Sequence, residues 1–490
     1  MLTLTAPPAT VALGTARVEA PGPAGEAIEA AGAALAAAGA PAPLLAQQAL
    51  NLRTAQALLD ALARPPADDL ARAVALAKIA SRHQAETLGL AWEPVEVVHH
   101  DSPSAALLAL AKGAGVAPTD AQIAQLRALD DLDPALRDAL TRVVDAFLAF
   151  DDAAAGADLA PILPARNELL DAVVALRDAL RETPRPASAA STIDMCPAFA
   201  IDLAGTADAY QGDHCTLIVD AGGDDRYRNN AGGAGGNDCP SLLGPRLEWT
   251  AAAVVDLGDG IDEYGDPANP QCGANGGCFG GGAGFLLDGG GGDVYDTDSF
   301  GTNGGGYGGC AGFLLDVGGD DTYDAGSWAT NGGGSAGGLG ALLDLGGDDN
   351  YVAGGIGTHG GGAAGAGFLL DAGGHDVYVA LDEGTNGGAN LGSGFLLDAL
   401  GNDEYVAGVM GTNGGAWAGG KGFLLDARGT DAYAGTNGSV DLASVGLLFD
   451  GGGMGDSYQS SDGDMPSGTD QTISLDPSIG LGVQVDVPLP

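Results

Sequence analysis

A short apolar run followed by an acidic, glycine-rich turn recurs through the second half of the chain. In the unit from Gly312 to Tyr323, three apolar residues precede Asp316, and Asp321 lies two residues before the tyrosine. Nine such units are recognisable, with their first Asp at Asp220, Asp256, Asp288, Asp316, Asp344, Asp371, Asp398, Asp426 and Asp450. From Asp288 to Asp426 the spacing is 27 or 28 residues. A fixed period of this length predicts a solenoid, because each unit buries its apolar side only by stacking on its neighbours.

Each unit is expected to form one coil with three sides. The apolar run and the Asp-x-Tyr segment predict two short strands, and a glycine-rich segment that begins with Thr-Asn-Gly-Gly closes the coil. Repetition of this coil predicts a Gly/Asp-rich parallel β-solenoid of about nine coils over residues 200–458.

The apolar strand is expected to be buried on both sides. Side chains alternate along a strand, so Phe313 and Leu315 face one way and Leu314 faces the other. Since both sets are apolar, one fills the solenoid core and the other needs a cover. The expected covers are the helical domain, the C-terminal cap, or a second copy of the chain in a homo-oligomer that forms through this apolar strand face.

The first half of the chain has a different pattern. Apolar residues three and four apart, as in Leu169, Val173, Leu176 and Leu180, are typical of amphipathic helices. We therefore predict a multidomain protein, in which an all-α N-terminal domain precedes the solenoid. The predicted divisions are an extended arm at 1–22, the α-helical domain at 23–185, a linker at 186–199, the solenoid at 200–458 and a C-terminal cap at 459–490.

Charge narrows the expected partners. The formal net charge is -46, and residues 200–460 hold 36 acidic but five basic residues. Such a surface repels nucleic acid and anionic lipid, which bind through Lys and Arg, and it attracts cations. We expect no nucleic-acid partner, and no apolar run is long enough to predict a transmembrane segment. The acidity by itself also fits a solvated surface that serves solubility.

The acidic turns are the candidate metal sites. Glycines allow tight turns and leave carbonyl groups accessible, and two carboxylates in each turn add the oxygen ligands that calcium prefers. The alternative is that these Asp side chains cap backbone N–H groups of the turns. The predicted calcium ligands are Asp288, Asp293, Asp316, Asp321, Asp344, Asp349, Asp371, Asp376, Asp398, Asp403, Asp426 and Asp431.

The turn sequence Gly318-Gly319-Asp320-Asp321-Thr322-Tyr323 resembles part of the nonapeptide of the RTX family of calcium-binding β-rolls, which are Gly/Asp-rich bacterial repeat proteins. The resemblance covers about a quarter of each unit. This chain has one such turn in 27 or 28 residues rather than two in 18, and a Tyr where the family usually has Leu. The resemblance implies calcium sites built on Asp321 and its equivalents.

Six cysteines fall between Cys196 and Cys310, at the start of the repeats. An even, clustered set without a CxxC pair predicts disulfides and a secreted or cell-surface protein, although six cysteines allow 15 pairings. The N-terminus has no basic segment that would indicate a signal peptide.

The sequence favours a non-enzymatic function. No G-x-S-x-G or phosphate-binding G-x-x-x-x-G-K motif is present, and no carboxylate pair stands out from the many. We expect a calcium-stabilised extracellular structural or adhesive protein, whose ligand would be a surface or a glycan. The alternatives are a ligand-binding solenoid for ice or polysaccharide and, third, a carbohydrate-active enzyme. Thr302–Asn303 and its equivalents fit an outward ice-binding grid or an internal asparagine ladder, while Trp328 and Trp417 suit sugar stacking or packing.

Overall fold

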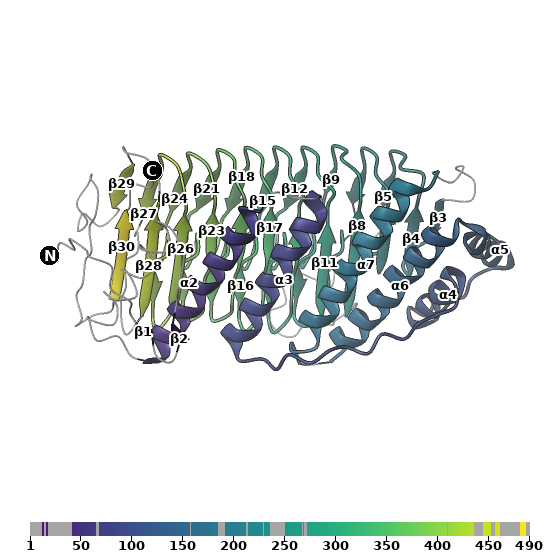
Figure 1. The fold of residues 1–490 in the computed structure, drawn as a ribbon, viewed down its shortest axis with the longest axis horizontal. Helices are drawn as coiled ribbons and strands as arrows, with labels where there is room; N and C mark the ends of the chain where they lie inside the picture. Colours follow the sequence, from purple (N-terminus) through teal and green to yellow (C-terminus); the bar gives the residue numbers. More distant parts are fainter. Residues whose placement is uncertain are drawn as a thin grey trace.

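The computed structural model describes most of the chain. The described residues are 42–64, 68–156, 158–184, 192–211, 214–228, 230–235, 250–266, 268, 272–408, 410–435, 444–451 and 456–460, with three further short strands, β1 (Ala12–Leu13), β2 (Ala16–Arg17) and β30 (Leu481–Asp486). The protein has two parts, a layer of helices and a β-solenoid against which the helices pack (Figure 1).

The helical region predicted from the sequence is confirmed. Its six described helices are α2 (Ala42–Leu62), α3 (Asp69–Leu88), α4 (Pro103–Gly113), α5 (Asp120–Ala128), α6 (Pro134–Ala154) and α7 (Ile162–Glu182). Local chemistry fixes several starts: Ser102 caps α4 by accepting the Ala105 N–H, and Asp133 caps α6 with Pro134 at its first position. Thr119 and Gln122 form a capping box at α5.

Three parallel sheets form the sides of the solenoid. The first contains β3 (Thr192–Met195), β4 (Phe199–Asp202), β6 (Leu217–Asp220), β8 (Ala251–Asp256), β11 (Ala283–Leu287), β14 (Leu314–Leu315), β17 (Leu342–Asp344), β20 (Leu369–Asp371), β23 (Leu396–Asp398), β26 (Lys421–Asp426), β28 (Val445–Asp450) and β30. The second contains β5 (Ala209–Gln211), β7 (Arg226–Arg228), β9 (Glu263–Tyr264), β12 (Val294–Thr297), β15 (Thr322–Ala325), β18 (Asn350–Ala353), β21 (Val377–Ala380), β24 (Glu404–Ala407), β27 (Ala432–Gly435) and β29 (Ser457–Ser460). The third contains β10 (Cys278–Phe279), β13 (Gly306–Tyr307), β16 (Gly334–Ser335), β19 (Gly362–Ala363), β22 (Ala389–Asn390) and β25 (Ala416–Trp417).

The repeat period of about 28 residues is confirmed, but the predicted count of nine coils is too high, since the solenoid has about seven turns. The difference arises at the ends, because the third sheet runs only from β10 to β25 among the described residues. Before these strands, the third side continues in the described part of the chain only as an isolated bridge between Ala234 and Cys278. β3 is also exceptional, since it pairs antiparallel with β4 and lies inside the segment 186–199 that the sequence suggested as a linker.

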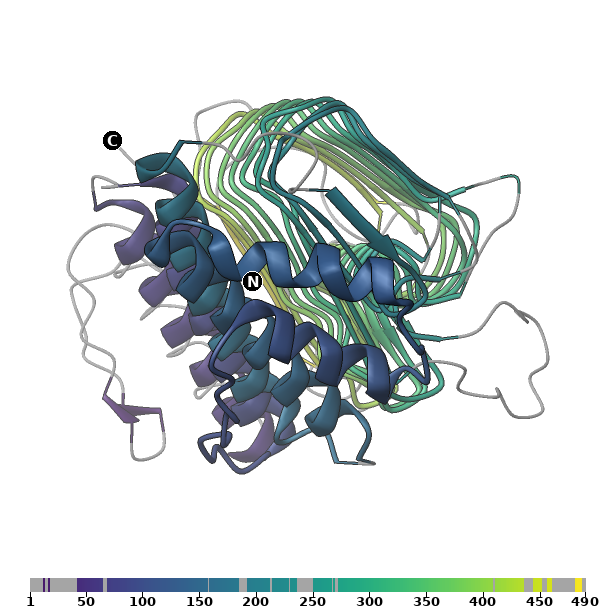
Figure 2. The same ribbon diagram turned by 90° about the vertical axis from the view of Figure 1, so that its right-hand side faces the viewer.

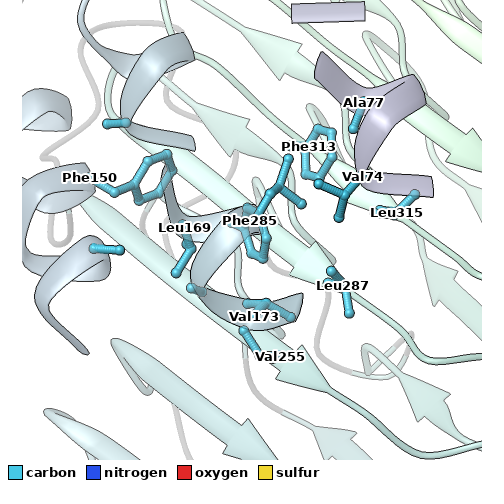
Figure 3. Close-up of a cluster of buried hydrophobic side chains, with 14 of the residues drawn as sticks. Val74, Ala77, Phe150, Leu169, Val173, Val255, Phe285, Leu287, Phe313 and Leu315 are labelled. Carbon is cyan, nitrogen blue, oxygen red and sulfur yellow. The ribbon is translucent and has the colours of Figure 1, made fainter. Parts of the chain in front are cut away.

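The helices cover the outer side of the first sheet (Figure 2). Phe313 and Leu315 point into this interface and pack in one apolar cluster with residues such as Val74 and Val173 (Figure 3). Leu314 faces inward instead, toward Tyr323. The prediction that another layer buries the apolar strand is therefore correct. The surface suggested for a homo-oligomer is occupied by helices of the same chain.

Polar side chains fix the helical layer in register with the coils. Gln84 Nε2 donates to the Gly340 carbonyl at 2.8 Å, and the buried Arg166 guanidinium lies 4.4 Å from the centre of the Phe313 ring. The His83 ring centre lies 4.8 Å from that of Phe395, with the planes inclined by 52°, and burial lowers the pKa of His83 to about 3, so its ring is neutral. These contacts require particular partners on the sheet, so the helical layer sits in one position.

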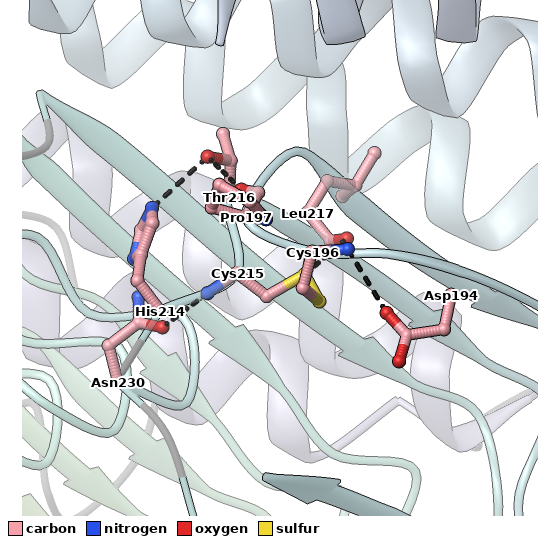
Figure 4. Close-up of a disulfide and its surroundings, with 8 residues drawn as sticks. All are labelled: Asp194, Cys196, Pro197, His214, Cys215, Thr216, Leu217 and Asn230. Atoms are coloured by element: carbon pink, nitrogen blue, oxygen red, sulfur yellow. Dashed lines mark hydrogen bonds between the residues drawn. A yellow bond between two sulfur atoms is a disulfide. The ribbon is translucent and has the colours of Figure 1, made fainter. Parts of the chain in front are cut away.

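Two disulfides are described, as the cysteine pattern predicted. Cys196 joins Cys215 at a Cα–Cα distance of 4.9 Å and ties the β3–β4 hairpin to the next coil (Figure 4). Cys278 of β10 joins Cys310, which follows β13, at 6.0 Å. Both bonds therefore link neighbouring coils in the N-terminal half of the array. None of the described helices is long and apolar enough to cross a membrane.

Candidate cation column inside the solenoid

The first Asp of each unit points into the solenoid. Asp316 lies two residues after the inward-facing Leu314, so strand alternation places both side chains on the same side. The carboxylate of Asp316 is fully buried, and its Oδ1 accepts the Gly318 N–H at 2.8 Å. The same bond recurs in Asp344, whose Oδ1 accepts the Gly346 N–H at 2.8 Å. These carboxylates hold the start of each acidic turn from inside.

A ladder of tyrosines stands opposite the first Asp column. Tyr323 stacks on Tyr351 with ring centres 4.7 Å apart and planes within 3° of each other. The Tyr323 hydroxyl donates to Asp344 Oδ2 of the next coil at 2.5 Å and is 3.3 Å from Asp316 Oδ2 of its own coil. Burial, together with the charges of these two carboxylates, raises the pKa of Tyr323 well above its usual range. The tyrosines thus remain protonated donors to the column.

The second Asp of each unit uses one oxygen and leaves the other without a partner. Asp321 Oδ1 accepts the Asp293 N–H at 2.5 Å, and Asp349 Oδ1 accepts the Asp321 N–H at 2.7 Å. The Oδ2 atoms have no hydrogen-bond partner among the described residues in Asp225, Asp262, Asp293, Asp321, Asp349, Asp376, Asp403, Asp431 and Asp456. The alternative that these Asp side chains cap backbone N–H groups therefore explains the Oδ1 atoms but not the Oδ2 atoms. An unpaired buried oxygen is costly, and its repetition calls for a ligand.

The two Asp columns come together in groups of three. Asp288, Asp293 and Asp316 offer oxygens that all lie within 4.8 Å of one another, and Asp316, Asp321 and Asp344 do the same one coil further on. Two oxygens on opposite sides of a calcium ion are separated by about 4.8 Å, twice a typical Ca–O distance. The residues present therefore fit a calcium ion in each group.

All twelve Asp residues predicted as calcium ligands lie inside this column, with 0 to 2% of their surface exposed. The column also extends toward the N-terminus, through Asp220 and Asp256, to a group formed by Asp202, Asp208 and Asp220. The sequence analysis missed Asp202 and Asp208, although a signal was present. Asp208 lies two residues before Tyr210, and Tyr210 stacks on Tyr227 at 4.9 Å, so this segment is one more degenerate unit.

The buried column strongly favours the neutral state. Burial first, and then the charges of Asp316 and Asp344, raise the pKa of Asp321 to about 10. For the same kinds of reason, the pKa of Asp293 rises to about 8 and that of Asp376 to about 10. Near neutral pH the column must therefore hold protons or bind cations.

The Thr-Asn segments line the interior as well. Asn303 has a left-handed backbone with φ of 48° and donates to Asn331 Oδ1 at 3.0 Å. Thr302 and Asn303 are fully buried, which shows the internal ladder and removes the outward Thr/Asn grid on which the ice-binding alternative was based. His359 replaces Asn in one coil and continues the ladder through Nδ1, 2.8 Å from Asn386 Oδ1.

A separate pocket of about 280 Å³ lies where the ends of α4 and α6 meet the first coils. Thr216 donates to the Pro197 carbonyl at 2.9 Å, so the His214 Nε2–H must be the donor in the 3.1 Å bond to Thr216 Oγ1 (Figure 4). Thr250 donates to Asp151 across the pocket at 3.1 Å. The bond between Thr250 and Asp151 of α6 joins the helical layer to the coils, so the pocket is part of their junction.

Comparison of the chain with protein families, with curated proteins and with solved structures found no match.

Proposed function

We propose that the protein is a non-catalytic, extracellular structural or adhesive rod whose solenoid is stabilised by calcium ions along the Asp column. The observation that carries the proposal is the unpaired Oδ2 atom that recurs from Asp225 to Asp456. A buried carboxylate oxygen without a donor is unfavourable in every coil, and a cation shared between successive coils satisfies it.

Calcium suits the column better than magnesium. Calcium accepts six to eight oxygens in irregular geometry, including backbone carbonyls, whereas magnesium usually keeps several water molecules. The column is closely packed: Tyr323, Asp316 and Asp344 are fully buried and hydrogen-bonded to one another. Carboxylates and the carbonyls of the glycine turns are therefore the available ligands. In such a site the residues of this chain hold the ion, and the ion neutralises their charge.

Other features support an extracellular structural role. Disulfides persist in oxidising compartments, and both described bonds join neighbouring coils. Among the described residues, the helices pack on the first sheet, and we propose that the outer sides of the second and third sheets make contact with a surface (Figure 2). The acidic composition keeps such a rod soluble and directs it away from anionic partners.

Calcium should raise the melting temperature of the full-length protein. A ligand present at 100 times its Kd adds about 2.7 kcal/mol per site, which is roughly 3 °C per occupied site for a chain of 490 residues. Melting is followed by circular dichroism after exhaustive chelation and after calcium is restored, and retained metal is measured by elemental analysis. Magnesium at the same concentration is the control. An unchanged melting temperature, with no calcium retained, would show that protons alone neutralise the column.

A pair of neighbouring substitutions locates the effect. Asp321→Asn keeps the acceptor for the Asp293 N–H but removes an ionisable group from the column, whereas Asp320→Asn makes the same chemical change on the exposed side of the turn. We expect Asp321→Asn to melt higher than wild type in chelator and to gain less from calcium. Asp320→Asn should respond to calcium as wild type does. Equal calcium responses in the two variants would place the ions outside the column.

A further inference from the structure

Four aromatic side chains gather on the outside of the solenoid at the corner between the second and third sheets. Phe279 and Tyr307 stack with ring centres 5.1 Å apart, and Phe300 lies 6.0 Å from Tyr307. Trp328 lies 6.2 Å from Tyr307, with its ring inclined by 59°, and is 37% exposed. We call these four residues the aromatic patch. Large apolar side chains that cluster on a soluble surface commonly mark a binding site.

The repeat shows that the fold does not require these rings. Tyr307 pairs in register with Ser335, and the next coils place Ala363 and Asn390 along the same sheet. At the other position of the patch, the Gly301 N–H bonds to the Trp328 carbonyl, and the Ala329 N–H bonds to that of Ile356 in the following coil. The following coil thus has Ser335 and Ile356 at the positions equivalent to Tyr307 and Trp328. We infer that the aromatic side chains are not needed for folding and take part in binding.

The structure also holds the patch rigid. Phe279 follows Cys278, whose disulfide to Cys310 crosses from β10 to the segment after β13, directly beside Tyr307. The aromatic stack ends at Ser335, which pairs in register with Tyr307, and Trp328 stands at an angle to the Tyr307 ring. The disulfide restrains the two segments that carry Phe279 and Tyr307, so these side chains lose little conformational entropy when a ligand binds.

The surroundings of the patch favour an uncharged, hydroxyl-rich ligand. Asp296 and Asp324 pair in register on β12 and β15, and Asp298 lies two residues before Phe300. Carboxylates accept hydrogen bonds from hydroxyl groups, while aromatic rings pack against the C–H faces of sugar rings. Phosphates and uronic acids would be repelled by the same carboxylates.

We propose that the aromatic patch binds a neutral polysaccharide chain, with sugar rings packed on Tyr307 and Trp328 and with hydroxyl groups bonded to the neighbouring carboxylates. This site lies outside the coils and does not depend on the calcium column. Binding at this site would give the rod its adhesive contact. A test of this site can succeed or fail whether or not the column binds calcium.

The test uses the full-length protein with cellohexaose, laminarihexaose and chitohexaose as neutral probes, titrated by calorimetry and by the change in tryptophan fluorescence. We expect at least one neutral probe to bind, and Tyr307→Ser and Trp328→Ile to weaken it at least tenfold. Both substitutions copy residues that the chain itself carries at the equivalent positions of the following coil, so the fold is kept. Hexagalacturonate should not bind.

Trp417→Ala is the matched control, because Trp417 lies on the same sheet in β25, away from the patch. Its binding should equal that of wild type, and the melting temperatures of all variants show whether each has folded. The proposal is wrong if none of the three neutral probes binds, if Tyr307→Ser and Trp328→Ile bind as wild type does, or if hexalysine displaces the bound probe, since the last result would identify a basic peptide as the partner.

Discussion

Replacing Gly355 with alanine should prevent the solenoid from folding, whereas the same change at the neighbouring Gly354 should be tolerated. A Cβ atom at Gly355 would lie 0.9 Å from the carbonyl oxygen of Ser327 in the preceding coil, and 1.9 Å from its carbonyl carbon. These are backbone atoms, and they cannot turn away as a flexible side chain would. The Cβ of an alanine at Gly354 would meet nothing closer than the Gly326 carbonyl oxygen at 3.9 Å.

The comparison between these variants is direct, because neither position has a positive φ and each receives the same methyl group. Soluble yield, circular dichroism and thermal melting report the outcome. We expect Gly354→Ala to melt within about 1 °C of wild type, a change of roughly 1 kcal/mol in a chain of 490 residues. A cooperatively folded Gly355→Ala variant with an unchanged melting temperature would contradict the close approach of neighbouring coils at this corner.

The second large effect is an inverted dependence of stability on pH in the calcium-free protein. The folded-state pKa values of Asp262, Asp293 and Asp403 are raised to about 8 from the ordinary value of 3.8. Between these limits the folded protein binds protons that the unfolded chain has released, so stability falls as pH rises. Each such proton changes the free energy of unfolding by about 1.4 kcal/mol per pH unit. The melting temperature should therefore decrease steadily from pH 6.5 to 8.

This pH range isolates the column from other buried groups. His83 and His214 have pKa values lowered to about 3, so they reduce stability only below their ordinary value of 6.5. The pKa of Arg166 is lowered to about 9, so its effect begins above the range. Saturating calcium should remove the slope, since the bound ions take the place of the protons. A calcium-free protein whose melting temperature rises from pH 6.5 to 8 would contradict the buried, ionisable column.

Much of the fold follows from residue order alone. The Asp and Tyr positions predicted the coils and their period, and the apolar residues on both sides of Leu314 indicated a covering layer. The alternation that turns Leu314 inward also turns Asp316 inward, although carboxylates are rarely fully buried in proteins. Strand alternation alone therefore predicts that the Asp column lies inside the solenoid, whereas the general preference of charged side chains for water argues against this position.

Other features depend on contacts that no local pattern contains. The pairing of Cys278 with Cys310 requires two neighbouring coils to place their cysteines side by side, and spacing alone left 15 pairings open. The unit around Asp202 and Tyr210 lacks the paired glycines of most other turns, so its Asp-x-Tyr core is a weak signal until the tyrosine is seen in the stack. The position of each helix on the sheet likewise depends on distant partners, such as Gln84 and Gly340.

The helical layer also changes how the repeat array comes apart. In a bare solenoid each coil touches only its neighbours, so the end coils can fray one at a time. Here Gln48 donates to the carbonyls of both Gly422 and Val445, on adjacent strands, and the His83 ring contacts Phe368 and Phe395 of successive coils. One coil cannot leave without exposing side chains that also hold the next. The helices thus link the one-dimensional array into a single cooperative unit, which should unfold in one transition.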